Sequence, residues 1–152
     1  MSASIFLDQN NVADVEEGDE FAPKFDDSGL ICCVVSDHTT NEVVMVAYMN
    51  AEALSRTIST RTATYWSRSR QKYWVKGETS GHTQRVERMR VDCDQDVILM
   101  SVTTAGTGAN CHTGRTSCFY RDLDLGGSGF EPKLTTSDTH RHFDPAQIYK
   151  AD

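Results

Sequence analysis

The chain carries two apolar runs close together, LICCVV at residues 30–35 and EVVMVAY at residues 42–48. Both runs are rich in the β-branched and aromatic residues that favour β-strands. The residues between them, 37–41, are polar and typical of a turn. The two runs therefore predict a β-hairpin, and the other elements can be placed relative to it.

A short helix and several further strands are predicted after this hairpin. Asn50 suits the N-cap of a helix over residues 51–59, and Glu52 lies in its first turn, where a carboxylate is favourable. The further strand candidates are short apolar or alternating stretches, at residues 63–67, 73–75, 82–93, 97–102 and 118–120. We expect an α+β fold that is mostly β, with antiparallel strands and one or two short helices.

Length and local composition indicate one central domain with two peripheral segments. A chain of 152 residues can bury one good core and is short for two. Residues 1–28 are acidic and weakly periodic, so we expect a mobile or loosely docked N-terminal arm. Residues 29–120 form the predicted domain. Residues 121–152 form a C-terminal extension, in which Asp144 and Pro145 can start a short helix.

The composition argues against two classes of partner. A net charge of −7 disfavours general nucleic-acid binding, which depends on neutralising phosphates. No apolar run approaches the roughly 20 residues needed to span a membrane, and the N-terminus lacks the pattern of a secretory signal. We therefore expect a cytoplasmic protein with neither nucleic-acid nor membrane partners. Basic residues concentrate in the middle of the chain, which suits a small anionic ligand.

Three of the five cysteines are candidate metal ligands, because thiols in a reducing compartment more often bind metals than form disulfides. Cys111 and Cys118 flank a loop containing Gly114, which is flexible enough to bring both sulfurs to one ion. Together with Cys93 they could form a zinc site with one open position, as in catalytic zinc centres. His112 could position or deprotonate a water there. Two unrelated buried thiols are the plainer alternative.

Three aspartates surround Cys93. If residues 91–97 are extended, Asp92, Asp94 and Asp96 share one face and Cys93 projects from the other. Three carboxylates on one face repel one another unless a cation neutralises them, and oxygen ligands suit magnesium. The same geometry implies that Cys93 serves a second site, either behind its strand or in another subunit. The alternative is a solvated acidic edge or turn.

The remaining cysteines, histidines and tryptophans have plainer interpretations. Cys32 and Cys33 lie inside an apolar run, and we expect both to be small buried residues. The other rings are assigned to solvent or core: His38, His140 and His142 are expected to be solvated, and Trp66 and Trp74 to pack in the core or at an interface.

Two segments with cations, hydroxyls and glycines form a candidate phosphate cradle. Arg68 and Arg70 offer the bidentate donors that phosphate accepts. Lys76 and Ser80 belong to a Lys-Gly-Glu-Thr-Ser-Gly stretch whose backbone amides can also bind anions. Either segment alone is more often a solvated surface, but together they indicate a cradle for a phosphate and a sugar.

These motifs together resemble one enzyme family, phosphoribosyl-AMP cyclohydrolase of histidine biosynthesis. The shared segments follow in the same order from Phe25 to Tyr120: MVAYMN at 45–50, YWSRSR at 65–70, WVKGETSGH at 74–82, DCDQD at 92–96, CHTG at 111–114 and SCF at 117–119. The resemblance implies hydrolysis of the N1–C6 bond of the adenine ring of phosphoribosyl-AMP. It implies a chain without the pyrophosphohydrolase domain that some members carry, since only 32 residues follow Tyr120.

The resemblance also implies cofactors and an assembly. Members are similar to one another as intertwined homodimers of mostly β structure, with one zinc and one magnesium per subunit. The cysteines that match Cys93, Cys111 and Cys118 bind zinc, and the first of these comes from the partner subunit. The matching aspartates, Asp92, Asp94 and Asp96, bind magnesium, and His112 is the expected proton shuttle.

Two other classes of protein compete with this interpretation. A zinc-dependent nucleobase deaminase typically carries H-x-E and P-C-x-x-C motifs, whereas no cysteine here follows a proline and no C-x-x-C is present. A binding module stapled by zinc would need four protein ligands and a closed metal site.

Overall fold

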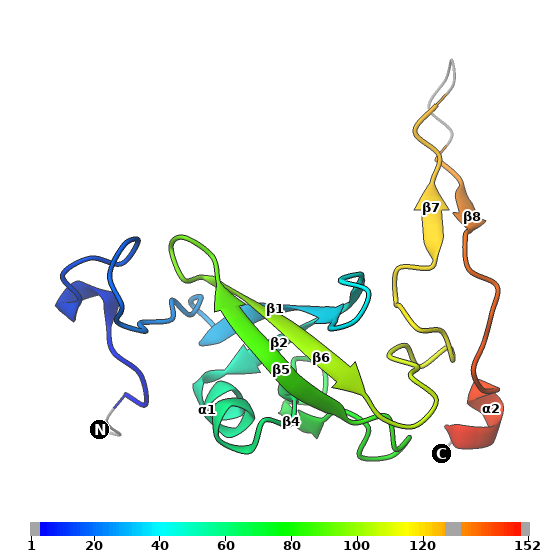
Figure 1. The fold of residues 1–152 in the computed structure, drawn as a ribbon, viewed down its shortest axis with the longest axis horizontal. Coiled ribbons are helices and arrows are strands. Elements are labelled where there is room, and N and C mark those ends of the chain that lie inside the picture. The colour runs from blue at the N-terminus through cyan, green and yellow to red at the C-terminus, as the bar shows by residue number, and fades with distance from the viewer. Residues whose placement is uncertain (1–3, 127–131, 150–152) are drawn as a thin grey trace.

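The computed structural model describes residues 4–126 and 132–149. At its centre is a four-stranded sheet with the strand order β2-β1-β6-β5 (Figure 1). Its strands are β1 (Leu30–Asp37), β2 (Val43–Asn50), β5 (Gln84–Val91) and β6 (Val97–Thr104). The fold is mostly β with few helices, as predicted, and the predicted hairpin is the antiparallel pair β1–β2.

One pair in this sheet departs from the expected antiparallel arrangement. β5 and β6 are antiparallel, but β6 lies parallel to β1, with Ile98 opposite Cys33. Burial explains which strand of the β5–β6 hairpin lies inside. β6 buries Ile98, Met100 and Val102, whereas β5 exposes several arginines that are better placed at a sheet edge. The apolar strand β6 therefore lies next to β1 inside the sheet, and β5 forms the edge.

The crossover from β2 to β5 contains a helix and a small hairpin. Helix α1 (Ala51–Thr60) begins as predicted, since the Asn50 side chain accepts a hydrogen bond from the Ala53 amide at 2.8 Å. Strands β3 (Thr64–Ser67) and β4 (Lys72–Val75) follow as an antiparallel pair. None of the helices within residues 4–126 and 132–149 is long and apolar enough to cross a membrane.

The core lies between the sheet, α1 and the β3–β4 hairpin. Its largest fully buried side chains are Tyr65, Ile31, Met49, Leu54, Ile98 and Met100. Cys33 is buried among them, as expected, but Cys32 on the opposite face of β1 is only half-buried. The sheet thus packs one face tightly, and its ends carry the loops that hold the candidate site.

The C-terminal region contains two elements that the sequence did not predict and one that it did. Strands β7 (Arg121–Leu123) and β8 (Leu134–Thr136) form a hairpin that projects from the body of the molecule (Figure 1). Residues 118–120 are not a strand, so that prediction is wrong. The Cys118 amide donates to the Val44 carbonyl of β2 at 2.7 Å, but no strand pairing follows from this bond. Helix α2 (Pro145–Ile148) begins at the predicted Asp144 cap.

The segment around the aspartates is a turn rather than an extended strand. β5 ends at Val91, and the Gln95 amide donates to the Asp92 carbonyl at 3.1 Å. Gln95 itself has a positive φ of 58°. The prediction of an extended segment is wrong because five residues must connect two adjacent antiparallel strands, and only a tight turn can do so.

The N-terminal arm, for which a mobile or loosely docked arrangement was expected, lies against this turn in the structure. The arm contains one 3-10 helix, η1 (Gln9–Asn11). Gln95 is buried and its side-chain amide makes three hydrogen bonds to the arm: it accepts from the Ala22 amide and donates to the Val15 and Glu20 carbonyls. These bonds, with a cluster of Phe6, Phe21 and Phe25, fasten an acidic segment that is irregular over most of its described length.

Candidate functional site

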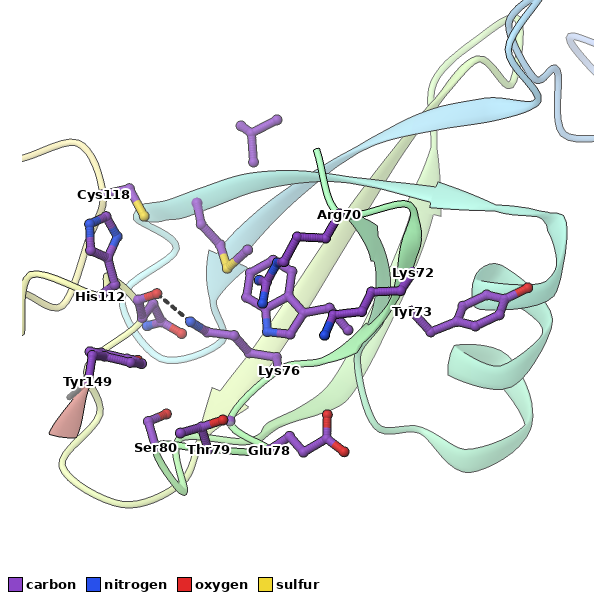
Figure 2. A pocket seen from close by; sticks show the side chains of 15 residues that line it. Arg70, Lys72, Tyr73, Lys76, Glu78, Thr79, Ser80, His112, Cys118 and Tyr149 are labelled. Atoms are coloured by element: carbon purple, nitrogen blue, oxygen red, sulfur yellow. Dashed lines mark hydrogen bonds between the residues drawn. The ribbon is translucent and has the colours of Figure 1, made fainter. Parts of the chain in front are cut away.

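A cavity of about 580 Å³ lies at the end of the β3–β4 hairpin and contains several of the predicted site residues. Figure 2 shows His112 and Cys118 at one end of this cavity, Lys76 in the middle, and Arg70 and Lys72 on the opposite side. The volume falls in the range of small-molecule binding sites. Residues that line it include Arg70, Lys76, Ser80, His112, Cys118 and Tyr149.

Cys111 and Cys118 form a pair of adjacent thiols. Their loop is held by hydrogen bonds between the Cys111 amide and the Arg115 carbonyl (3.1 Å) and between the Gly114 amide and the Cys111 carbonyl (3.0 Å). The neighbouring Cys118 thiol lowers the pKa of Cys111, and Cys111 in turn raises the pKa of Cys118. The Thr113 hydroxyl donates to the Cys111 sulfur at 3.1 Å. Two neighbouring sulfurs, one of them with a lowered pKa, are a donor set that suits zinc.

His112 lies between these two cysteines in sequence and its side chain is exposed at the cavity (Figure 2). The loop therefore presents an imidazole beside the sulfur pair. A side chain that can act as a general acid or base thus lines the same cavity as a candidate metal ligand, Cys118.

Lys76 is buried in the cavity wall. Its ammonium donates to the Asn110 carbonyl at 2.6 Å and lies 5.4 Å from the centre of the Trp74 ring. Burial lowers the pKa of Lys76, although the neighbouring Cys118 and Cys111 act in the opposite direction. A lysine held in this way adds positive charge to a site that contains thiolates.

A buried network supports the loop from behind, and the sequence did not indicate it. The Tyr65 hydroxyl donates to Gln84 at 2.6 Å, and Gln84 donates in turn to the Asn110 side chain at 2.7 Å. Asn110 also donates to the Thr116 carbonyl at 3.0 Å. Burial raises the pKa of Tyr65 far above its usual value, so the phenol stays a donor. The network connects the sheet to the cysteine loop.

The predicted phosphate residues are divided between two hollows. Arg70 and Ser80 line the cavity with Lys76, where the sequence placed them together. Arg68 instead stacks over the Tyr48 ring at 4.0 Å and lines an adjoining, more open hollow with Arg70 and Trp66. Val46, Arg70 and Trp74 line both hollows, so an elongated ligand could contact both.

The three aspartates also come together, although through a turn. One oxygen of each carboxylate lies within 4.8 Å of the others. Burial acts to raise the pKa of Asp92, but hydrogen bonds from the Val97 amide and from Asp96 outweigh it and lower the pKa, while Asp92 raises the pKa of Asp96. Such a cluster fits a hard divalent cation. Cys93 is exposed in the same turn.

The two groups of ligands lie at opposite ends of β6 (Figure 1). The turn with Cys93 and the aspartates precedes Val97, and the loop with Cys111 and Cys118 follows Thr104. Seven strand steps separate these ends by about 23 Å. The structure therefore brings Cys111, Cys118 and His112 together at one end of β6. It brings the three aspartates and Cys93 together at the other end. Within one chain, Cys93 does not reach the other two cysteines.

Comparison with known proteins gives the family. The family model for phosphoribosyl-AMP cyclohydrolase matches residues 45–120. A phosphoribosyl-AMP cyclohydrolase of Sinorhizobium fredii is 55% identical over 137 residues, covering 90% of this chain and 89% of the relative. Relatives with the same name from Rhodopseudomonas palustris and Rhizobium rhizogenes are 57% and 53% identical, covering 90% and 91% of each chain. The chain belongs to the phosphoribosyl-AMP cyclohydrolase family. The resemblance stated from the motifs, and with it the assignment as a hydrolase, is confirmed.

Three residues near the cysteine loop or the cavity were not identified from the sequence: His142, Phe143 and Tyr149. All three lie beyond residue 120, where the match to the family model ends. His142 was expected to be solvated, but it is half-buried and its ring lies 2.7 Å from the Thr116 hydroxyl, so that expectation is wrong. Phe143 stacks on His82, and Tyr149 lines the cavity. Their proximity depends on how residues 121–149 fold back, which no local pattern reveals.

Proposed function

We propose that this chain hydrolyses the N1–C6 bond of the adenine ring of phosphoribosyl-AMP, in histidine biosynthesis, as the names of its relatives suggest. The observation that carries the proposal is one cavity lined by the Cys118 thiol, the His112 imidazole and several cations. The cations suit a ligand with two phosphates, and the other groups suit the attack of water on an electron-poor ring.

Zinc is the metal proposed for the cysteine pair, with Cys93 as a third ligand. The sulfur donors, one of them with a lowered pKa, fit zinc, and three protein ligands leave one position open. When bound, zinc would act as a Lewis acid that brings the pKa of a coordinated water to about 7. Magnesium is proposed for Asp92, Asp94 and Asp96, whose clustered oxygens fit a hard cation.

The residues of the chain have distinct roles in the proposed reaction. His112 accepts a proton as water adds to C6 of the ring, and it returns a proton to N1 as the N1–C6 bond breaks, so that C6 becomes a carboxamide. Lys76 adds positive charge beside the thiolates. Arg70 and Ser80 hold one phosphate in the cavity, and Arg68 contacts the rest of the substrate in the adjoining hollow.

A homodimer is part of the proposal, because Cys93 cannot reach Cys111 and Cys118 along its own chain. The supporting observation is the separation of about 23 Å along β6. In the proposed intertwined dimer each zinc site takes Cys111 and Cys118 from one subunit and Cys93 from the other. A cytoplasmic location is consistent with five unpaired cysteines, three of them needed as thiolate ligands.

The test is an assay of ring opening with purified protein, phosphoribosyl-AMP, zinc and magnesium. We expect the ultraviolet spectrum of the adenine ring to disappear without release of ammonia. His112→Ala should lower kcat by about 10²–10⁴-fold, the usual contribution of a general acid–base group. His38→Ala is the matched control, since His38 is exposed at the β1–β2 turn, and it should keep full activity.

Two outcomes of this assay would contradict the proposal. Release of ammonia with the ring intact would indicate a deaminase, which attacks the same carbon but expels the exocyclic nitrogen. Zinc binding with no change in the substrate at all would indicate a zinc-stabilised binding module.

A further inference from the structure

The C-terminal segment at residues 137–149 returns from the β7–β8 hairpin and lies along the loop that carries Cys111 and Cys118 (Figure 1). It is fastened at its start, where the Ser137 amide donates to the Tyr120 carbonyl at 2.9 Å. The Arg115 guanidinium then donates to the Asp138 carbonyl at 2.9 Å. The segment thus begins its contact with the loop just after the second cysteine.

His142 makes the closest connection to the loop. Its amide donates to the Gly114 carbonyl at 2.7 Å, and its Nε2 lies 2.7 Å from the Thr116 hydroxyl. Both partners lie between the two cysteines in sequence. Gly114 has a positive φ of 88°, and a side chain there would collide with the Phe143 carbonyl. The loop is therefore shaped to receive this segment.

Phe143 extends the contact to a second loop. Its ring stacks on His82, with 5.2 Å between ring centres and 11° between planes. His82 is held in turn by the Thr107 hydroxyl, 2.8 Å from its Nε2. The segment therefore joins the loop after β4 to the loop after β6, and at its end Tyr149 reaches the cavity (Figure 2).

The cysteine loop needs such support because its residues, 105–120, form no helix or strand. Metal ligands must be held close to their bound geometry for tight binding. Residues that hydrogen-bond to the surroundings of the ligands often set metal affinity. The hydrogen bonds from Tyr65 through Gln84 to Asn110 hold the loop on the side of the sheet. Residues 137–149 hold it on the side away from the sheet.

We propose that residues 137–149 position the two-cysteine loop for zinc, with His142 as the positioning residue that acts through Thr116. This inference rests on the zinc site of the proposed function, and it assigns a role to a segment outside the residues matched by the family model. The segment contributes no metal ligand. It keeps Cys111 and Cys118 in the geometry that zinc requires.

The experiment measures zinc affinity of the full-length protein by competition with a chromophoric chelator. His142→Ala should weaken zinc binding by about tenfold, the scale of effect for partners behind metal ligands. His142→Gln should restore most of the affinity, because its amide can reach Thr116 as Nε2 does. His140→Ala is the matched control: the His140 side chain is exposed and touches the His142 ring, but it has no hydrogen bond to the cysteine loop, so its loss should leave the affinity unchanged.

A second variant removes the same contact from the loop side. Thr116→Val should weaken zinc binding as much as His142→Ala, and the double variant should be no worse than either single one. Cobalt(II) in place of zinc should show an altered visible spectrum in both. Zinc affinity equal to wild type in both single variants would overturn this inference alone. Wild-type protein that binds no zinc would overturn the proposed function as well.

Discussion

Cys118 and Cys32 are two incompletely buried thiols with different predicted roles, so they form a matched pair for testing the zinc site. Cys118→Ala removes a proposed ligand and should weaken zinc binding by more than about 100-fold. Removing a residue that only hydrogen-bonds to a metal ligand already lowers metal affinity by about 10–100-fold. Cys32→Ala should keep its zinc and lose little stability. Zinc content after dialysis against a chelator measures both. Retention of zinc by Cys118→Ala would exclude this residue as a ligand.

His82 makes stability depend on pH. Burial lowers the pKa of His82, and the nearby Lys76 lowers it further. As pH drops below about 6.5, the ordinary pKa of histidine, His82 takes up a proton in the unfolded chain but not yet in the folded protein. The free energy of unfolding therefore falls as pH drops from about 6.5 toward the lowered pKa of the folded state. We expect the free energy of unfolding, measured by urea titration, to fall more between pH 7 and pH 5 in wild type than in His82→Gln. An equal fall in both would contradict the assignment.

At the scale of residues, the sequence identifies groups with reactive chemistry better than the groups that support them. Cys111, Cys118 and His112 are recognisable because thiols and imidazoles in one short stretch are uncommon outside metal sites. Gln84 and Asn110 are ordinary polar residues in sequence. Their importance comes from burial and from partners more than twenty residues away, which only the folded chain specifies.

At the scale of elements, strands and caps were predictable because apolar runs and Asn50 act locally. The turn at residues 92–96 was not predictable, because alternating aspartates also fit an extended strand. The pairing of β5 with β6 decides in favour of the turn. The carboxylates still cluster. The turn, rather than one face of a strand, therefore brings the three carboxylates together. The length of β6, rather than alternation along a strand, is what separates Cys93 from Cys111 and Cys118.

The docked N-terminal arm should stabilise this aspartate turn. Gln95→Gly keeps the positive φ accessible but removes three hydrogen bonds to the arm, so it should lower the free energy of unfolding by about 2–4 kcal/mol. It should also weaken magnesium binding, because the turn loses its support. Urea denaturation and magnesium titration measure the two effects. Gln71→Gly, at an exposed turn with a similar φ of 50°, is the control and should change neither substantially. Unchanged stability in Gln95→Gly would show that the arm contributes nothing.

The end of the C-terminal segment should contribute to substrate binding through Tyr149. Its side chain lines the cavity at the same end as His112 (Figure 2). Tyr149→Ala should raise KM by about fivefold, the loss of about 1 kcal/mol of apolar contact, with kcat nearly unchanged. Tyr149→Phe keeps the ring and should resemble wild type. A fall in kcat with KM unchanged would place Tyr149 in the chemical step instead.

At the scale of the whole molecule, one strand separates the two groups of ligands. β6 has Cys93 and the aspartates before its first residue and the Cys111–Cys118 loop after its last. No local pattern predicts this separation, because it depends on the sheet order β2-β1-β6-β5. A zinc site with all three cysteines would therefore need a second chain, which is why a closed two-fold homodimer is part of the proposed function.

The most direct test of a site shared between subunits is complementation between two inactive variants. Cys93→Ala and Cys111→Ala should each be inactive alone. Co-expressed in equal amounts, they should form heterodimers in which one of two sites has all three thiols, giving about a quarter of wild-type ring-opening activity. Cys111→Ala with Cys118→Ala is the control pair, which should stay inactive because both variants are defective in the same half of the site. Heterodimers of the first pair that are isolated and show no activity would contradict the shared site.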